Sequence, residues 1–146
     1  MPTHTFQAKL AWRPEGALTG THEATIPGKT SLQVSAAPQY KGDGTKPNPE
    51  ELFVTALASC QLLSYVMQAP RIGVTVLAYE DDPVGTLAIA DKKMRVTEVV
   101  LRPRITIAAD ADEAKARKLV DTAHDGCFIA NSVACAVRIE PTIVRA

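Results

Sequence analysis

The amino-acid sequence predicts an α+β fold, and three features of its hydrophobic pattern lead to this prediction. Residues 4–12 alternate apolar and polar side chains, as a half-buried strand does. Residues 52–69 carry apolar side chains on every face of a helical wheel, which indicates a helix buried on most sides. The expected strands and helices do not alternate regularly, which argues against a parallel α/β sheet. We therefore expect antiparallel β-sheets around a long central helix.

Before this helix the sequence predicts two further strands, at residues 17–26 and 31–35. Turn sequences precede each of them, Arg-Pro-Glu-Gly at residues 13–16 and Pro-Gly-Lys at residues 27–29. Consecutive strands joined by short turns are most simply arranged as a meander.

The start of the long helix is the clearest local signal in the chain. Asn48 is a good N-cap, Pro49 suits the first helical position, and Glu51 stands three residues after the cap. Glu50 and Glu51 also lie where the helix dipole favours negative charge. We therefore expect the helix to begin at Pro49.

A membrane span is the alternative for so long an apolar segment, since about 20 residues are enough to cross a bilayer. Polar residues interrupt the segment at five positions: Thr55, Ser59, Gln61, Ser64 and Gln68. The rest of the chain offers no second span. These observations favour a buried helix.

The second half of the chain continues the mixture of strands and helices. We expect, in order, a strand at residues 72–79, a turn at 81–85, a strand at 96–107, a helix capped by Asp110 and ended by Gly126, a short helical segment at 127–132, and a strand at 133–139. Pro103 indicates an edge or a bulge in the strand at 96–107.

Length and composition limit the classes of protein that fit. A chain of 146 residues fits a single domain spanning residues 1–146. Its formal net charge of zero gives no electrostatic reason to expect nucleic acid or a membrane as partner. The N-terminal residues show no basic segment followed by an apolar one, so we expect a cytoplasmic protein with reduced thiols.

The three cysteines are the candidate chemical groups, and the residues alone leave their roles open. Cys60 lies in the apolar helix, where a cysteine is either a small packing residue or a nucleophile. Cys127 follows Gly126 at a chain reversal, where backbone N–H groups favour a thiolate. Cys135 fits the core face of the last strand. His124 and Cys127 could form half of a metal site, but no second pair completes it.

Two cysteine-centred motifs resemble those of the OsmC/Ohr superfamily of thiol peroxidases. The first is Asn-Pro-Glu-Glu-Leu-Phe at residues 48–53 followed by Ala-Ser-Cys at residues 58–60, and the second is Gly-Cys-Phe-Ile-Ala-Asn-Ser at residues 126–132. The motifs occur in the family's order, and the succession of strands and helices also fits over nearly the whole chain. The resemblance implies an OsmC-like fold.

The resemblance also implies roles for individual residues. The cysteine that matches Cys60 attacks an organic hydroperoxide, and the cysteine that matches Cys127 converts the resulting sulfenic acid into a disulfide. An external dithiol, such as a lipoyl-type one, then reduces the disulfide. The glutamate that matches Glu50 pairs with an arginine that activates the thiolate. No metal or organic cofactor is implied.

The family takes this arginine from the first hairpin or from the loop before the helix. That loop has Gln39, Tyr40 and Lys41 here and no arginine, which leaves Arg13 in the first turn as the candidate. Without a nearby cation, apolar surroundings would disfavour the thiolate of Cys60.

Helix geometry indicates that the site is shared between two subunits. Glu50 and Cys60 are ten residues apart, so they stand about 15 Å apart along one straight helix. Unless the helix bends sharply, they can meet only if Glu50 of one subunit approaches Cys60 of the other across a two-fold axis. Two antiparallel copies of the helix, packed centrally, would achieve this and would also bury it. We therefore expect an intertwined homodimer.

Two other functions remain open at this stage. The chain could be a non-enzymatic module of the same fold that binds an apolar small molecule between subunits. It could also be a hydrolytic or acyl-transfer enzyme in which His124 acts as the base for Cys60.

Overall fold

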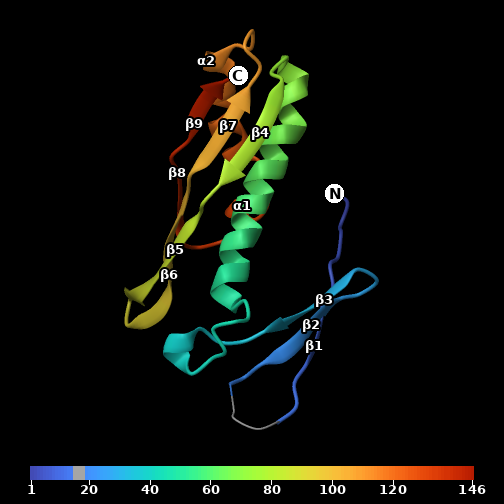
Figure 1. Ribbon diagram of the computed structural model, residues 1–146, viewed down its shortest axis with the longest axis vertical. Coiled ribbons are helices and arrows are strands. Elements are labelled where there is room, and N and C mark those ends of the chain that lie inside the picture. The colour runs from blue at the N-terminus through green and yellow to red at the C-terminus, as the bar shows by residue number, and fades with distance from the viewer. Residues whose placement is uncertain (15–18) are drawn as a thin grey trace. The chain divides into compact units, whose positions relative to one another are not determined.

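The computed structural model describes residues 1–14 and 19–146, and it confirms the predicted α+β class (Figure 1). The strands are β1 (Lys9–Ala11), β2 (His22–Ile26), β3 (Thr30–Val34), β4 (Val76–Asp81), β5 (Val84–Ala90), β6 (Lys93–Leu101), β7 (Pro103–Ile107), β8 (Ala136–Ile139) and β9 (Thr142–Arg145). The helices are α1 (Pro49–Gln68) and α2 (Glu113–Asp125), with 3₁₀ turns at Pro38–Tyr40, Ala69–Ile72 and Ala130–Ser132. The chain divides into two compact units, residues 1–52 and residues 53–146.

The first unit contains the meander that the turn sequences predict. Strands β1, β2 and β3 form an antiparallel sheet in that order, with Leu10 opposite Ala24 and Ala24 opposite Leu32. Strand β1 is shorter than the predicted strand at 4–12. Residues 15–18, which belong to the predicted turn and to the start of the second predicted strand, lie outside the described residues.

The apolar face predicted for the first strand is exposed in this chain. Phe6 is 93% exposed, Leu10 67% and Trp12 53%, so the prediction of a half-buried strand is wrong for the single chain. Alternation shows which side chains share a face of a strand, but it does not supply the surface that covers that face.

The predicted start of α1 is confirmed in detail. The backbone N–H of Glu51 donates to the side-chain oxygen of Asn48 at 2.9 Å, and the backbone N–H of Asn48 donates to the Glu51 carboxylate at 3.1 Å. This reciprocal pair is a capping box, which satisfies two backbone donors at the helix end.

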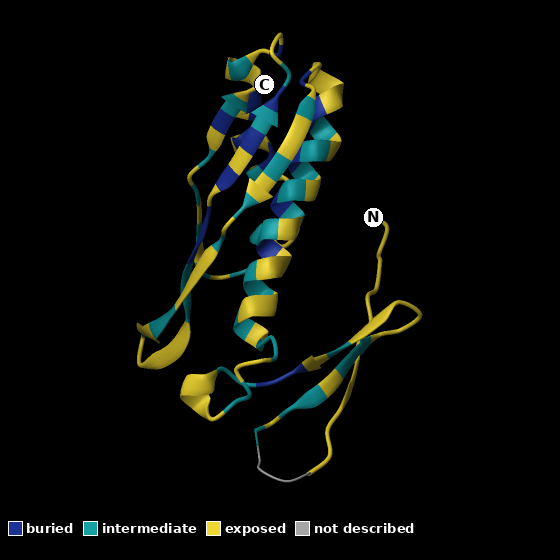
Figure 2. Ribbon diagram, in the orientation of Figure 1, coloured by how far each residue is buried: buried dark blue, intermediate teal, exposed yellow. Residues whose placement is uncertain are grey.

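Helix α1 buries only one of its faces within the chain (Figure 2). Leu57 and Tyr65 are buried, whereas Leu63 is 55% exposed and Met67 66%. The expectation of burial on most sides is therefore not met by one chain alone, because the sheets of the second unit cover one side of the helix. Within the described residues, one helical segment, Pro49–Ile72, is long and apolar enough to cross a membrane, a test that core helices of soluble proteins also pass.

The second unit contains two three-stranded sheets, ordered β4-β7-β9 and β5-β6-β8. The expected antiparallel pairing holds for β4 with β7 and for β5 with β6, whereas β8 and β9 each pair in parallel. The sequence prediction missed β5 and β9 and joined β6 and β7 into one strand. The chain passes from one sheet to the other between β6 and β7, and a hydrophobic pattern continues unchanged across such a crossing.

Pro103 lies at the first residue of β7 and is buried. The prediction that it marks an edge or a bulge is wrong, because β7 is the central strand of its sheet. A proline is tolerated there because the first residue of a strand can do without an N–H group in the ladder.

The two sheets pack against different parts of α1. Leu57 forms a core with Val99 and Leu101 of β6. Further along α1, Tyr65 belongs to a second core, which contains Ile105 of β7 and the apolar stripe of α2. This stripe consists of Ala116, Leu119, Val120 and Ala123. The predicted stripe is confirmed.

The N-cap of α2 is Asp112 rather than Asp110, since the side chain of Asp112 accepts from the N–H of Lys115 at 3.1 Å.

Polar side chains hold the chain where it crosses between the sheets. The backbone N–H of Arg102 donates to Asp81 at 2.7 Å, and the Arg102 guanidinium pairs with Glu140 at 3.2 Å. Arg138 pairs with Glu98 at 2.9 Å and with Glu140 at 3.5 Å. These contacts connect the ends of β4, β6 and β8. Burial raises the pKa of Asp81 above its ordinary value, although the N–H of Arg102 opposes this.

The raised pKa of Asp81 predicts a pH dependence of stability. Between the ordinary pKa and the raised one, the folded protein binds more protons at Asp81 than the unfolded chain does, so this carboxyl lowers the free energy of unfolding as pH rises through that interval. We expect Asp81→Asn to gain stability relative to the unsubstituted protein as pH rises through the same interval. Chemical denaturation from acid to neutral pH measures this difference.

Glu80→Gln is the matched control, because Glu80 is exposed on the same strand. Its difference curve should be flat. If the stability difference between Asp81→Asn and the unsubstituted protein also stayed constant with pH, the raised pKa of Asp81 would be contradicted.

Candidate functional site

Cys60 lies in the middle of α1 and is half-buried. Its neighbour Gln61 points into the protein and is 1% exposed. The site is therefore built on a regular helix, with one side of the Cys60 environment formed by the interior of the second unit.

Three polar side chains of α1 attach it to α2. The amide of Gln61 donates to the carbonyl of Val120 at 3.2 Å, and the hydroxyl of Ser64 donates to the carbonyl of Ala123 at 2.9 Å. The hydroxyl of Tyr65 donates to the carbonyl of Ala116 at 2.9 Å. We call these three bonds the interhelix ladder. It places the C-terminal end of α2 next to the part of α1 that carries Cys60.

Cys127 follows directly after this end of α2, as the sequence predicts. Gly126 closes the helix, with its N–H donating to the carbonyl of Thr122 at 3.2 Å. The N–H of Cys127 then donates to the carbonyl of His124 at 3.1 Å, and the side chain of Cys127 is 1% exposed. The N–H of Ala130 donates to the Cys127 sulfur at 3.5 Å, so one backbone donor is directed at the thiol.

The structure brings Cys60 and Cys127 together. Both are free thiols, and Cys60 lies close enough to Cys127 for the two side chains to interact. Burial raises the pKa of Cys127, and the neighbouring Cys60 raises it further, whereas the N–H groups of Ala130 and Ile129 lower it. Two thiols distant in the sequence, one half-buried and one buried, are thus neighbours in the second unit.

Cys135 has the packing role that the sequence predicts. It precedes β8, is half-buried, and packs against the core formed by Leu57, Val99 and Leu101. It contributes to the apolar cluster and takes no part in the contact between the other two thiols.

Glu50 and Arg13 both belong to the first unit. Glu50 lies in the first turn of α1 and is half-buried. Arg13 is exposed and follows β1 in the chain. Their predicted roles stay predictions.

The pairing of His124 with Cys60 considered from the sequence stays a hypothesis. Its ring atom Nδ1 is buried and has no hydrogen-bond partner in the part of the chain that the structure describes. Its backbone carbonyl, not its ring, contacts Cys127. Among residues 1–14 and 19–146, no group of three or more His, Cys, Asp or Glu side chains could hold a metal ion.

Two buried polar groups of the second unit were missed by sequence reasoning. Gln61 was counted only as an interruption of an apolar helix, and Tyr79 only as the end of an alternating strand. In the structure, the side-chain oxygen of Gln61 and the hydroxyl of Tyr79 are both buried, and neither has a hydrogen-bond partner within the described residues. A polar residue at a core position of a helix is the signal that could have identified Gln61.

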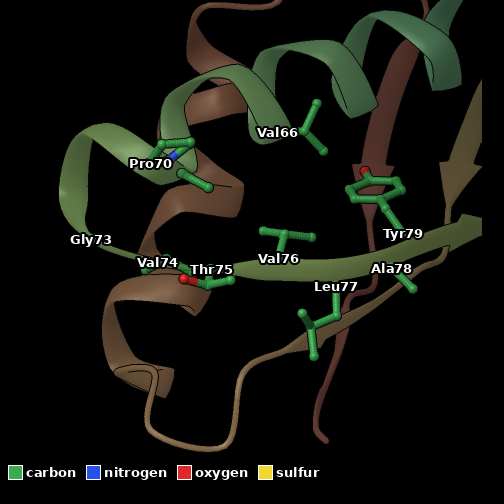
Figure 3. Close-up of a pocket in the computed structure, with 10 residues that line it drawn as sticks. Val66, Pro70, Gly73, Val74, Thr75, Val76, Leu77, Ala78 and Tyr79 are labelled. Atoms are coloured by element: carbon green, nitrogen blue, oxygen red, sulfur yellow. The ribbon is translucent and has the colours of Figure 1, made fainter.

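Tyr79 also lines a cavity of about 520 Å³ between the C-terminal end of α1 and β4 (Figure 3). The other walls are mostly apolar and include Val66, Val74 and Val76. The cavity therefore combines a mostly apolar lining with the hydroxyl-bearing side chains of Thr75 and Tyr79.

Comparisons with known proteins agree on one family. The family model described as OsmC-like protein matches residues 42–142. An OsmC-like protein of unknown function from Vibrio cholerae is 31% identical, with a TM-score of 0.88 over 95% of this chain and 99% of that one. An organic hydroperoxide resistance protein OsmC from Legionella pneumophila is 22% identical, with a TM-score of 0.73 over 99% of both chains. The uncharacterized protein YmaD of Bacillus subtilis is 24% identical over 136 residues, 91% of this chain and 89% of that protein.

The contact between two of the three thiols predicts selective disulfide formation. Mild oxidation with diamide is expected to join Cys60 to Cys127 and to leave Cys135 free, because a disulfide forms only between sulfurs that the backbone already holds close together. Peptide mapping by mass spectrometry after alkylation identifies the bonded pair. Disulfides that include Cys135 in comparable amounts would contradict the geometry.

Proposed function

Since this chain belongs to the OsmC-like family, within the OsmC/Ohr superfamily, we propose that it is a thiol-dependent peroxidase that reduces organic hydroperoxides to alcohols. The observation that carries the proposal is the contact between the thiols of Cys60 and Cys127. A reaction that ends in a disulfide needs two sulfurs that can approach each other, and Cys60 and Cys127 are neighbouring thiols. The name of the Legionella pneumophila relative, an organic hydroperoxide resistance protein, supports the choice of substrate class.

The proposed reaction begins with the thiolate of Cys60. It attacks one oxygen of the hydroperoxide, the O–O bond breaks, and the other oxygen leaves with its alkyl group and a proton as the alcohol. Cys60 is then a sulfenic acid. Apolar surroundings of α1 favour substrates with alkyl groups over small hydrated peroxides, because burial of an alkyl group is favourable.

Cys127 completes the oxidative half of the reaction. Its sulfur attacks the sulfur of the sulfenic acid, the S–S bond forms, the S–O bond breaks, and the hydroxide combines with the thiol proton of Cys127 to give water. A dithiol, for example of the lipoyl type, then reduces the disulfide by exchange and is itself oxidised. These steps belong to a compartment that keeps thiols reduced, and we place them in the cytoplasm.

We propose that two copies of the chain form the working enzyme. Helix α1 leaves Leu63 and Met67 exposed on its outer face, and a second α1 packed against this face would bury them. Glu50 and Cys60 stand about 15 Å apart along the axis of α1, so Glu50 serves the Cys60 of the partner subunit. Arg13 is the proposed cation that Glu50 orients toward the Cys60 thiolate.

A binding module is the alternative that one observation favours. The cavity of about 520 Å³ beside β4 is large enough for a small apolar molecule. Such a module would melt at a higher temperature with its ligand and would be oxidised slowly and unselectively at its thiols. The peroxidase would instead convert hydroperoxide with turnover.

A peroxide-consumption assay with cumene hydroperoxide and dihydrolipoamide tests the proposal. Cys60→Ser is expected to lower turnover at least about 100-fold, because it removes the nucleophile. Cys127→Ser should react once with the hydroperoxide and then accumulate sulfenic acid, which a dimedone adduct detects. Cys135→Ser is the matched control and should keep the activity. Equal turnover in Cys60→Ser and the unsubstituted protein would rule out the proposal.

Mixtures of two inactive variants test the shared site. Glu50→Ala and Cys60→Ser chains, unfolded together and refolded, are expected to yield heterodimers that hold one complete site. In a statistical mixture these heterodimers make up about half of the dimers, so the mixture should recover about a quarter of the activity. Activity no higher than that of the separate variants would contradict a site built from two subunits.

A further inference from the structure

The last turn of α2 ends shortly before Cys127, and its carbonyl groups need hydrogen-bond donors from outside the helix. The last four carbonyls of an α-helix have no N–H group four residues on within the same helix. In α2 these are the carbonyls of Thr122, Ala123, His124 and Asp125. The position of Cys127 depends on which donors they find, because the chain turns at this point.

Three of the four donors come from the residues that follow the helix. These bonds run from the N–H of Gly126 to Thr122 at 3.2 Å, from the N–H of Cys127 to His124 at 3.1 Å and from the side-chain amide of Asn131 to Asp125 at 3.0 Å. The fourth donor belongs to the other helix, since the hydroxyl of Ser64 in α1 donates to the carbonyl of Ala123 at 2.9 Å. Ser64 therefore caps the end of α2 from outside.

The bond from Ser64 replaces one that a longer helix would contain. In a continued α-helix the carbonyl of Ala123 accepts from the N–H four residues on, which is that of Cys127. In this structure the N–H of Cys127 donates to His124, only three residues back, and the chain turns more tightly. The hydroxyl of Ser64 satisfies the carbonyl that this turn deprives of its N–H. The side chain of Cys127 is 1% exposed in the resulting conformation.

The hydroxyl of Ser64 is itself oriented by a neighbour on α1. The side-chain amide of Gln68 donates to the hydroxyl oxygen of Ser64 at 3.0 Å and to its backbone carbonyl at 3.0 Å. Because a hydroxyl has a single proton, accepting from Gln68 leaves that proton for Ala123. A Cβ atom at Gly126 would lie 4.0 Å from the same hydroxyl, so Ser64 is close to the residue that precedes Cys127.

We propose that Ser64 is a positioning residue that sets where α2 ends and thereby holds Cys127 beside Cys60 for disulfide formation. This role rests on the proposed function, in which the disulfide is the product of the oxidative half of the reaction. Ser64 exchanges no proton or electron with the thiols. Without its hydroxyl, the carbonyl of Ala123 recovers the N–H of Cys127, because an unpaired buried carbonyl is costly. Helix α2 then extends past Gly126, and the sulfur of Cys127 moves away from Cys60.

A thiol–disulfide equilibrium tests this role without any peroxide. In a Cys135→Ser background, oxidised dithiothreitol converts the thiols of Cys60 and Cys127 into a disulfide and is itself reduced to the dithiol. Ser64→Ala is expected to lower the equilibrium constant for this disulfide about tenfold, because the two sulfurs are held less well in place. For a two-electron couple this raises the reduction potential by about 30 mV. Alkylation followed by mass spectrometry measures the oxidised fraction.

Two further variants in the same background separate positioning from general loss of stability. Tyr65→Phe is the matched control, because it also removes a hydrogen bond between α1 and α2, but at Ala116, far from Cys127 along α2. It should melt at a lower temperature and leave the potential unchanged. Ser64→Thr keeps a hydroxyl at the position and should restore the potential of the unsubstituted protein.

Three results would overturn the proposal. The first is an unchanged potential in Ser64→Ala. The second is an equal shift in Ser64→Ala and Tyr65→Phe, which would mean that any weakening of the contact between the helices moves the sulfurs apart. The third is a shift in Ser64→Thr as large as that in Ser64→Ala, since the hydroxyl would then not be the group that matters. Thermal melting of each variant confirms that the compared proteins are folded.

The same variants distinguish failure of this proposal from failure of the proposed function. If the protein reduces hydroperoxide, Ser64→Ala should form the sulfenic acid of Cys60 at the unchanged rate and the disulfide about tenfold more slowly. If the protein shows no peroxidase activity, the equilibrium with dithiothreitol still decides whether Ser64 positions Cys127. An unchanged potential in Ser64→Ala together with peroxidase activity removes the role of Ser64 alone.

Discussion

The interhelix ladder is the constraint on which the thiol pair depends. Carbonyl groups inside a helix already accept from the N–H four residues on, but each has a second lone pair that a side chain can use. Gln61 and Tyr65 use this second capacity at Val120 and Ala116, and Ser64 bonds the carbonyl of Ala123 in the last turn of α2. Because Cys127 follows α2 after only Gly126, the bonds that fix the helix also fix the sulfur. These polar residues of the otherwise apolar helix α1 thus help to place the two thiols next to each other.

The two sulfurs have different environments, and the difference suits the proposed division of labour. Cys60 is half-buried, so a substrate can approach it, whereas Cys127 is almost completely buried. A buried thiol with a raised pKa is a poor target for free peroxide. In the proposed reaction Cys127 attacks once a sulfenic acid has formed on the neighbouring Cys60, and its rate then depends on proximity more than on intrinsic reactivity. Burial therefore shields Cys127 from direct oxidation by peroxide. It also disfavours the thiolate, which local hydrogen-bond donors have to stabilise.

The sequence predicted what is local and missed what depends on the crossing of the two sheets. The capping box at Asn48 and the helix end at Gly126 are short-range arrangements of backbone and side chain, and both were found. The break at Arg102 between β6 and β7 was not, because apolar alternation continues through it while the partner strands change. The motifs around Cys60 and Cys127 identified the candidate thiols, but Tyr79 belongs to no motif. Its unpartnered hydroxyl is visible only when β4 is packed against both helices.

Helix α1 has two faces with different requirements, and this explains why its composition looks apolar on every side. The inner face is already satisfied within one chain by the two cores and the interhelix ladder. The outer face carries Leu63 and Met67, which the second unit leaves exposed. Burial of such a face against a copy of itself requires the two helices to be related by a two-fold axis, because an isologous contact uses the same patch twice. An antiparallel crossing then brings the negative first turn of each helix toward the middle of the other. In the proposed dimer, the same helix would supply both the apolar surface of the interface and the carboxylate of Glu50 for the thiol site.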